Sequence, residues 1–324
     1  MIDADETLAL LAALDEGAPA EKLEALMRGT ELDRVFPSAG ISRAFGLDCL
    51  LAVNDDARRL KLDESGKSVV GYLENLVQVR PRFEALLREF RESEADLTAS
   101  AFETTRRLLP ESCSLGRIRL VFLPLGLDFR TERETVYMDP LASVQYGLEG
   151  IRRTLSHEFH HVARYRLTGV NLTLMEPSET RRPESLADTF RVWVAWLEME
   201  GIADCVSNAT QVEIPSLREG IEERRRQMDQ YATLLGGALD SFRAANRGQA
   251  SNSTALGDLQ RSLGGLAHPV GARMAGYILT ELGRPSLVEC VGHPDRFLQR
   301  YNDVAIKKRL VGFDELFVDW LDPV

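Results

Sequence analysis

Apolar residues recur every three or four positions through the first third of the chain, which is the spacing of an amphipathic helix. The pattern is clear over residues 8–14, 23–27 and 83–90. No internal repeat and no chemical motif accompanies it. We therefore predict a helical N-terminal region over residues 1–109, with a structural or substrate-contacting role.

The pattern then changes to that of strands. Residues 117–124 alternate and then run apolar, and residues 135–139 predict a second strand that ends at Pro140. The segment between them, 126–134, contains glycine and several charges and predicts a turn. We expect one small sheet at about 117–139, packed beside a following helix at 147–167.

Helical spacing returns after this sheet. Long helices are predicted at 147–167, 183–208 and 216–247, and shorter ones at about 270–283, 294–301 and 313–321. The polar stretch 248–257 predicts a loop, and the charge run at 222–226 favours a solvated helix face over a binding site. The fold class is therefore α+β and mainly α, with a second region at 110–324 that carries the sheet and the C-terminal helices.

The amino-acid composition limits the classes of binding partner that we expect. The 324 residues are 44% hydrophobic and 27% charged, as in an ordinary globular chain, and the net charge is −11. Surplus negative charge repels nucleic acid and anionic membranes, so we expect neither as a partner. No apolar run is long enough to span a bilayer, and residues 1–16 predict an amphipathic helix rather than a secretion signal.

The four cysteines lie far apart in the sequence, with no pair at the spacing of a metal or redox motif: Cys49, Cys113, Cys205 and Cys290. Scattered thiols of this kind are typical of proteins from reducing compartments. We expect a cytoplasmic protein in which these cysteines are small core side chains.

One segment concentrates the chemistry. His157, Glu158 and His161 form a His-Glu-x-x-His pattern within a predicted helix. Positions i and i+4 lie on one helix face, so both histidines can bind one zinc ion, and Glu158 can face a water on that ion. Zinc lowers the pKa of such a water towards about 7, and a neighbouring carboxylate can accept its proton. The chain has only five histidines, and three of them fall within this segment. Coincidence is therefore a poor explanation for the motif. His160 lies off the shared face and is expected in a supporting or surface position.

A zinc site of this kind needs a third protein ligand. No histidine follows at the short spacing that some zinc enzymes use, since Gly169 and Val170 stand there. A carboxylate is therefore expected, and two segments compete, one beginning at Glu200 and one at Glu184. Each segment places an aspartate one helical turn after its glutamate. This aspartate, which is Asp204 in the segment of Glu200, can accept a hydrogen bond from a ligating histidine.

The motif and the downstream glutamate together resemble the gluzincin metallopeptidases. Their third ligand is a glutamate in a Glu-Gly-x-Ala or Glu-x-x-x-Asp context, and Glu200-Gly201-Ile202-Ala203-Asp204 fits both. The combination is also similar to uncharacterised bacterial families of zinc-dependent peptidases. The likeness covers residues 117–302 loosely and about ten positions tightly. It implies a zincin-like fold, bound Zn²⁺ and a peptide or protein substrate.

The spacing departs from this resemblance. Glu200 follows His161 by 39 residues, about twice the gap of the best-known gluzincins, whereas Glu184 follows it by 23. We favour Glu200 because Gly201 would let its helix approach the active-site helix closely. Glu184 is the alternative third ligand, although helix dipoles favour carboxylates in a first turn without any metal.

Peptidases of this class often place a histidine or tyrosine well downstream to stabilise the oxyanion. The candidates here are His268 and Tyr277, and related sequences carry a similar Gly-x-x-Met-Ala segment, here starting at Gly271. His293 is expected in a surface loop. The resemblance also implies that the strand at 117–124 is an edge strand that binds extended peptide.

Two other functions stay open at this level, a non-catalytic zinc-binding or regulatory protein that keeps the fold and another metal-dependent hydrolase. A di-iron site would use Glu158 and His161 as one of two Glu-x-x-His halves. Neither His268 nor His293 has a glutamate three residues before it, so the second half is missing.

Overall fold

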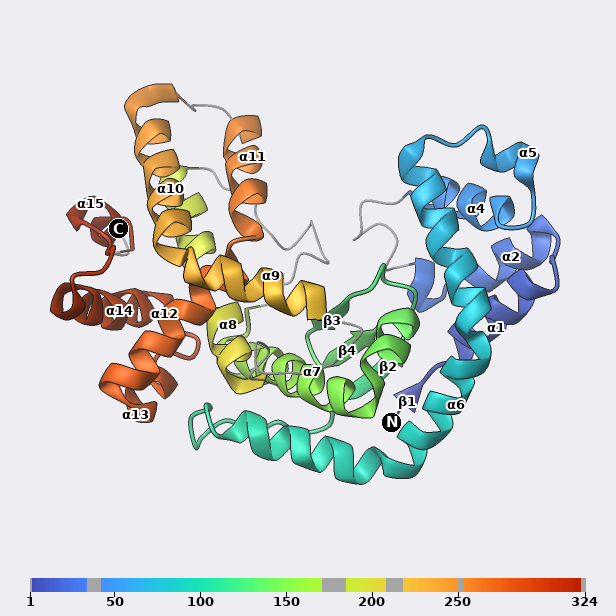
Figure 1. Ribbon diagram of the computed structural model, residues 1–324, viewed down its shortest axis with the longest axis horizontal. Coiled ribbons are helices and arrows are strands. Elements are labelled where there is room, and N and C mark those ends of the chain that lie inside the picture. Colours follow the sequence, from blue (N-terminus) through green and yellow to red (C-terminus); the bar gives the residue numbers. More distant parts are fainter. Residues whose placement is uncertain (1, 34–41, 171–184, 208–217, 250–252, 322–324) are drawn as a thin grey trace. The chain divides into compact units, whose positions relative to one another are not determined.

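The computed structural model describes residues 2–33, 42–170, 185–207, 218–249 and 253–321 (Figure 1). The chain forms two compact units. The first comprises the described parts of residues 1–99 and 116–152, and the second those of residues 100–115, 153–172 and 178–324. Two long helices, α6 (Glu64–Arg106) and α7 (Pro140–Thr168), begin in the first unit and end in the second.

The first unit combines helices with the only sheet among the described residues. Its other helices are α1 (Asp5–Asp15), α2 (Ala20–Met27), α4 (Arg43–Ala52) and α5 (Asp56–Arg59), and its strands are β1 (Ile2–Asp3), β2 (Arg119–Phe122), β3 (Phe129–Glu132) and β4 (Thr135–Met138). The strand order is β1-β2-β4-β3. β2 is parallel to both β1 and β4, and β3 is antiparallel to β4.

Aromatic packing and one buried carboxylate hold this sheet in place. The rings of Phe83 and Phe90 in α6 both meet the ring of Phe122 edge-on. Asp139 directly follows β4, and its carboxylate accepts hydrogen bonds from the backbone N–H of Ala142 in α7 and from the Tyr72 hydroxyl. A carboxylate that accepts from the first turn caps a helix. The sheet therefore leads directly into α7, which bends at Gly147 (φ +62°) before the part that carries the histidine motif.

The sheet lies where the sequence predicts it, but two of its strands were not expected. β3 occupies part of the segment predicted as a turn, and β1 pairs from the first residues of the chain. The expectation of an edge strand at 117–124 is wrong, because β2 lies between β1 and β4 in the strand order. β2 is paired with β1 at Leu120 and Val121 and with β4 along its whole length, so its centre offers no free edge to an extended peptide.

The second unit is helical throughout its described residues. It contains the last part of α7, then α8 (Leu186–Ser207), α9 (Arg218–Asp229), α10 (Tyr231–Ala244), a π-helical turn (Ala245–Gln249), α11 (Ser253–Gly264), α12 (Ala267–Leu282), α13 (Arg284–Val288), α14 (Pro294–Lys308) and α15 (Glu315–Asp319). α8 is buried along most of its length, which explains why its sequence lacks a polar face. Aromatic rings pack around Phe190 in α8, with Phe242 of α10 and Phe317 of α15 in contact.

The mainly helical α+β class is confirmed, while several boundaries differ. The helix predicted at 216–247 is two helices separated at Gln230, and α11 begins inside the stretch predicted as a loop at 248–257. None of the described helices is long and apolar enough to cross a membrane. The four cysteines are free thiols.

Candidate metal centre

Two helices, α7 and α8, supply the core of the site, all of it from residues of the second unit. His157 and His161 lie one turn apart on α7, and Glu200 and Asp204 lie one turn apart on α8. Side chains at i and i+4 share a helix face, so each helix presents a pair of polar groups to the other. All four side chains are at least four-fifths buried.

Three potential ligand atoms converge between these helices. The Nε2 atoms of His157 and His161 are 2.9 Å apart, and the Oε2 atom of Glu200 lies 3.1 Å from the first and 3.3 Å from the second. Tetrahedral zinc with bonds of about 2.0–2.2 Å would separate its ligand atoms by about 3.3–3.6 Å. The triangle is close to one face of such a tetrahedron, so the donor set and its spacing fit a zinc ion.

Proton placement supports the same interpretation. Two neutral imidazoles whose Nε2 atoms face each other can form one hydrogen bond only if one ring carries its proton on that nitrogen. The Nδ1 atom of His161 is buried and has no hydrogen-bond partner within the described residues. A cation bound by both Nε2 lone pairs would remove the contact between these two nitrogens and place the protons on the Nδ1 atoms, where Asp204 faces that of His157.

Glu158 lies beside this triangle. Its side chain is buried, and one of its carboxylate oxygens is within 4.8 Å of ligand atoms of both His157 and His161. Glu200 approaches the same histidines more closely, at 3.1 and 3.3 Å. The geometry therefore allows Glu200 to complete the ligand set while Glu158 faces a molecule bound next to it.

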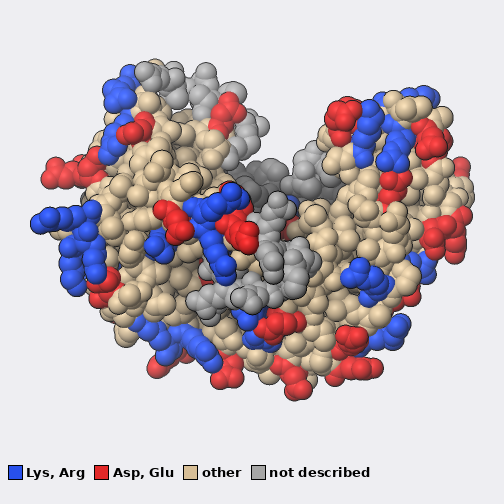
Figure 2. All heavy atoms as spheres, viewed as in Figure 1, with Lys and Arg blue, Asp and Glu red and all other residues tan. Residues whose placement is uncertain are grey.

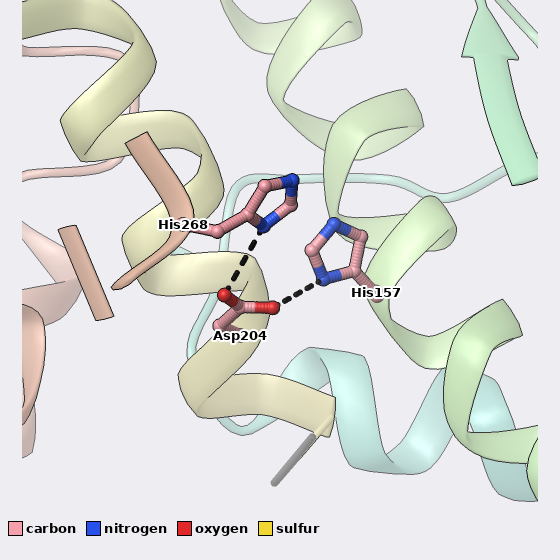
Figure 3. Close-up of side chains that lie close together, drawn as sticks. All are labelled: His157, Asp204 and His268. Carbon is pink, nitrogen blue, oxygen red and sulfur yellow. Dashed lines mark hydrogen bonds and ion pairs between the residues drawn. The ribbon is translucent and has the colours of Figure 1, made fainter. Parts of the chain in front are cut away.

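Asp204 holds two histidines at once (Figure 3). One carboxylate oxygen lies 3.2 Å from Nδ1 of His157, an ion-pair contact that is not aligned as a hydrogen bond, and the other accepts a hydrogen bond of 3.2 Å from Nδ1 of His268. A carboxylate at Nδ1 favours the proton on that nitrogen and leaves Nε2 available as a ligand or acid–base group. Asp204 thus orients both rings.

His268, from α12, completes the cluster. Its ring stacks on that of His157 with a centroid distance of 5.7 Å, and its Nε2 atom is 3.5 Å from Oε2 of Glu200. Its position follows from the close approach of α8 and α12. A Cβ atom on Gly201 would lie 2.4 Å from the carbonyl of Gly271, and one on Gly271 would lie 2.3 Å from the carbonyl oxygen of Leu197.

This contact corrects the reason for favouring Glu200. Gly201 was expected to let α8 approach α7, the active-site helix. It packs instead on Gly271 of α12, so its role is to bring His268 to Asp204. The α7 side of α8 presents Glu200 and Asp204 themselves.

The carboxylates and histidines of the cluster shift one another's pKa values. Burial would raise the pKa of Glu200, but the neighbouring His161 and His268 and the hydrogen bonds from the histidines outweigh it, so the pKa lies well below its usual value. For His157, burial would lower the pKa, but Asp204 and Glu200 raise it well above the usual range. The site therefore favours ionised carboxylates, which are the form that binds a metal, together with a protonated His157, which would release its proton on binding one.

His160 behaves differently from its neighbours. It is fully buried, which excludes the surface position and leaves the supporting one of the two that were expected. Neither ring nitrogen has a hydrogen-bond partner within the described residues. Burial, followed by the nearby His161 and His157, holds its pKa well below the usual value. His160 is thus a neutral core side chain.

The remaining predicted residues lie elsewhere. Tyr277 is nine positions after His268 on α12, about two and a half turns, and so lies on the opposite face of the helix. Its ring packs against Tyr231 and under Arg273 rather than among the histidines. Glu184, the alternative third ligand, lies outside the described residues. His293 is exposed at the start of α14, in agreement with the expectation of a surface position.

Sequence reasoning missed two arginines near the site. Arg224 belongs to the charge run that was interpreted as a solvated face, but its guanidinium lies 3.5 Å from Asp204. Arg164, one turn after His161, is buried against Glu198 of α8. The i+7 spacing from His157 places Arg164 on the motif face, and that spacing could have signalled its direction.

One family model matches the chain over residues 44–310, that of the DUF5700 family, described as "Putative zinc dependent peptidase". The match covers most of the sequence, so the chain belongs to this family. No curated protein and no solved structure matches it. The family's description agrees with the zinc-type donor set of His157, His161 and Glu200.

Proposed function

We propose that this protein is a zinc-dependent peptidase of the gluzincin type. The observation that carries the proposal is the convergence of three atoms from two helices, Nε2 of His157, Nε2 of His161 and Oε2 of Glu200. The buried carboxylate of Glu158 stands next to this ligand set, as hydrolysis requires. The substrate class is a peptide or protein.

Zinc, when bound, would supply a Lewis acid that acidifies a water and polarises the scissile carbonyl. The chain's own residues would do the rest. Glu158 would accept the proton of the attacking water and pass it to the leaving amine, since its carboxylate lies beside the ligands without being needed as one. Asp204 would keep His157 oriented through its Nδ1 atom.

His268 is our candidate for stabilising the developing oxyanion. Its Nδ1 atom is held by Asp204, which directs Nε2 towards the side of the cluster occupied by Glu200. The two carboxylates also raise its pKa against the effect of burial, which favours the proton-bearing form needed to donate a hydrogen bond. Tyr277 is left out of the proposal because its ring packs against Tyr231.

The test is a comparison of Glu158→Gln with the unmodified protein. Glutamine keeps the shape and removes the basicity, so zinc content measured by mass spectrometry should be unchanged. Hydrolysis of a mixed-peptide library should fall by roughly 10²–10⁴-fold, the usual share of general acid–base catalysis. Glu149→Gln, at an exposed glutamate on the same helix, is the matched control and should leave the rate unchanged.

Two results would overturn the proposal. Equal rates for Glu158→Gln and the unmodified protein would exclude Glu158 as the base. Absence of cleavage in the zinc-loaded unmodified protein, across the library, would favour a zinc-binding or regulatory protein without catalytic activity.

A further inference from the structure

A buried ion pair joins the two metal-binding helices just beyond the histidines. Nε and Nη2 of Arg164 in α7 lie 2.8 and 2.7 Å from Oε2 of Glu198 in α8. The side chains are 4% and 0% exposed, so the pair is shielded from water on all sides. No step of the proposed reaction uses either residue.

The second carboxylate oxygen of Glu198 contacts a third segment, the turn between α13 and α14. Oε1 accepts a hydrogen bond of 2.9 Å from the backbone N–H of Gly292 in this turn. Gly292 has φ +76°, and a Cβ atom there would lie 2.5 Å from Cγ2 of Thr168 at the end of α7. The ion pair therefore sits at a junction where α7, α8 and this turn meet.

Its place on each helix links it to the ligands. Arg164 follows His157 by seven positions and His161 by three, so all three share one face of α7. Glu198 precedes Glu200 by two positions in α8, about 200° round the helix, so it acts on that ligand through the backbone of α8 and not through a shared face. A slide of one helix past the other by one residue would move the ligands by about 1.5 Å. Metal–ligand distances tolerate about 0.2 Å, so the relative position of α7 and α8 must be fixed closely.

Stability alone does not account for such a pair. Replacement of a buried ion pair by apolar residues of similar volume is often neutral or stabilising, because desolvation offsets the attraction. A bidentate or forked arginine contact is directional, however, and an apolar contact is not.

We propose that Arg164 and Glu198 are positioning residues that set α7 against α8 so that His157, His161 and Glu200 meet at one point. The inference rests on the proposed function, since it concerns the same metal site. It predicts that the ion pair contributes to metal affinity and geometry more than to the stability of the metal-free chain.

The test uses the double variant Arg164→Met/Glu198→Met and Co²⁺ as the probe. Methionine fills the volume without charge, so the melting temperature of the metal-free chain should stay within a few degrees of the parent. The dissociation constant for Co²⁺ should rise about 10–100-fold, the range seen when groups that orient metal ligands are removed. The visible absorption bands of bound Co²⁺ should also shift, because they report coordination geometry.

Two further variants make the outcome decisive. Arg300→Met/Glu289→Met removes an exposed ion pair of the same unit, 3.2 Å long, and should leave Co²⁺ binding unchanged. Arg164→Lys keeps the buried charge balanced but loses the forked contact, and should give an intermediate loss of affinity with altered bands. If the double variant does not fold, Arg164→Lys is judged by the same measurements.

Parent-like Co²⁺ affinity and spectrum in the folded double variant would overturn this inference and leave the proposed function intact. Failure of the unmodified protein to bind Co²⁺ or Zn²⁺ would overturn both.

Discussion

Asp204 shows how one carboxylate can organise a whole site. It contacts Nδ1 of His157 and Nδ1 of His268, and Arg224 lies 3.5 Å from it. Burial would raise the pKa of its carboxyl, but His268 and His157 outweigh this effect and lower the pKa, so it stays ionised. A fixed negative charge behind a ligating imidazole raises the basicity of that ligand.

Replacing Asp204 by alanine should therefore weaken zinc binding about 10–100-fold. The affinity is best measured by competition with a chromophoric chelator at fixed pH. Asp240→Ala, at an aspartate of α10 that is 76% exposed, is the matched control and should bind zinc as the unmodified protein does. Parent-like affinity in the Asp204 variant would show that the two histidines are oriented without it.

At this scale the sequence predicted much of the candidate site. Helical spacing places His157 and His161 together, and Glu200 and Asp204 one turn apart, and the structure brings all four side chains to one cluster. The burial of His160 and the contact of Arg224 were not predictable in the same way. Both depend on which neighbouring helix covers a given face, and a single sequence carries no such information.

The close contact of α8 and α12 is the main feature at the scale of elements. Gly201 and Gly271 leave no room for a Cβ atom, with backbone atoms at 2.4 and 2.3 Å. Contact between backbones cannot be relieved by rotating a side chain, so any larger residue must push the helices apart. The first consequence would be a longer distance between His268 and Asp204.

We expect Gly271→Ala to destabilise the chain by about 1–3 kcal/mol, the usual cost of overpacking, and to weaken zinc binding. Chemical denaturation and zinc titration measure the two effects. Gly236→Ala in α10, where a Cβ atom would meet nothing within 4 Å, should be neutral or stabilising by up to about 1 kcal/mol. Equal stability of the two variants would contradict the close approach of α8 and α12.

Elements were predicted well where apolar spacing was regular and poorly where it was not. α7 and α8 were expected close to their observed positions, whereas β1 and β3 were not expected at all. β3 has only four residues and includes Arg130 and Glu132, so it lacks a readable apolar alternation. The break at Gln230 was missed because the flanking sequence keeps its helical character on both sides.

For the whole molecule, the division into two units has a direct consequence for metal binding. The predicted ligands and their supporting residues all belong to the second unit, and the sheet belongs to the first. On the face shown in Figure 2, Lys and Arg are interspersed with Asp and Glu rather than gathered by sign. Because the predicted ligands belong to the second unit, zinc should act on that unit.

Zinc loading should stabilise the second unit. At a free concentration 100 times the dissociation constant, binding to the native state contributes about 2.7 kcal/mol. Hydrogen exchange followed by mass spectrometry should slow in α8 and α12, with little change in α1 and α2. Addition of a chelator should reverse the effect. Equal protection of both units would show that the metal acts elsewhere or on the whole chain.

The central claim is that one zinc ion is held by His157, His161 and Glu200. A crystal structure of the zinc-loaded protein, with anomalous data collected on both sides of the zinc absorption edge, tests it most directly. We expect a single anomalous peak at about 2.0–2.2 Å from Nε2 of both histidines and from a carboxylate oxygen of Glu200. A peak ligated by Glu184 in place of Glu200, or a peak away from His157 and His161, would contradict it.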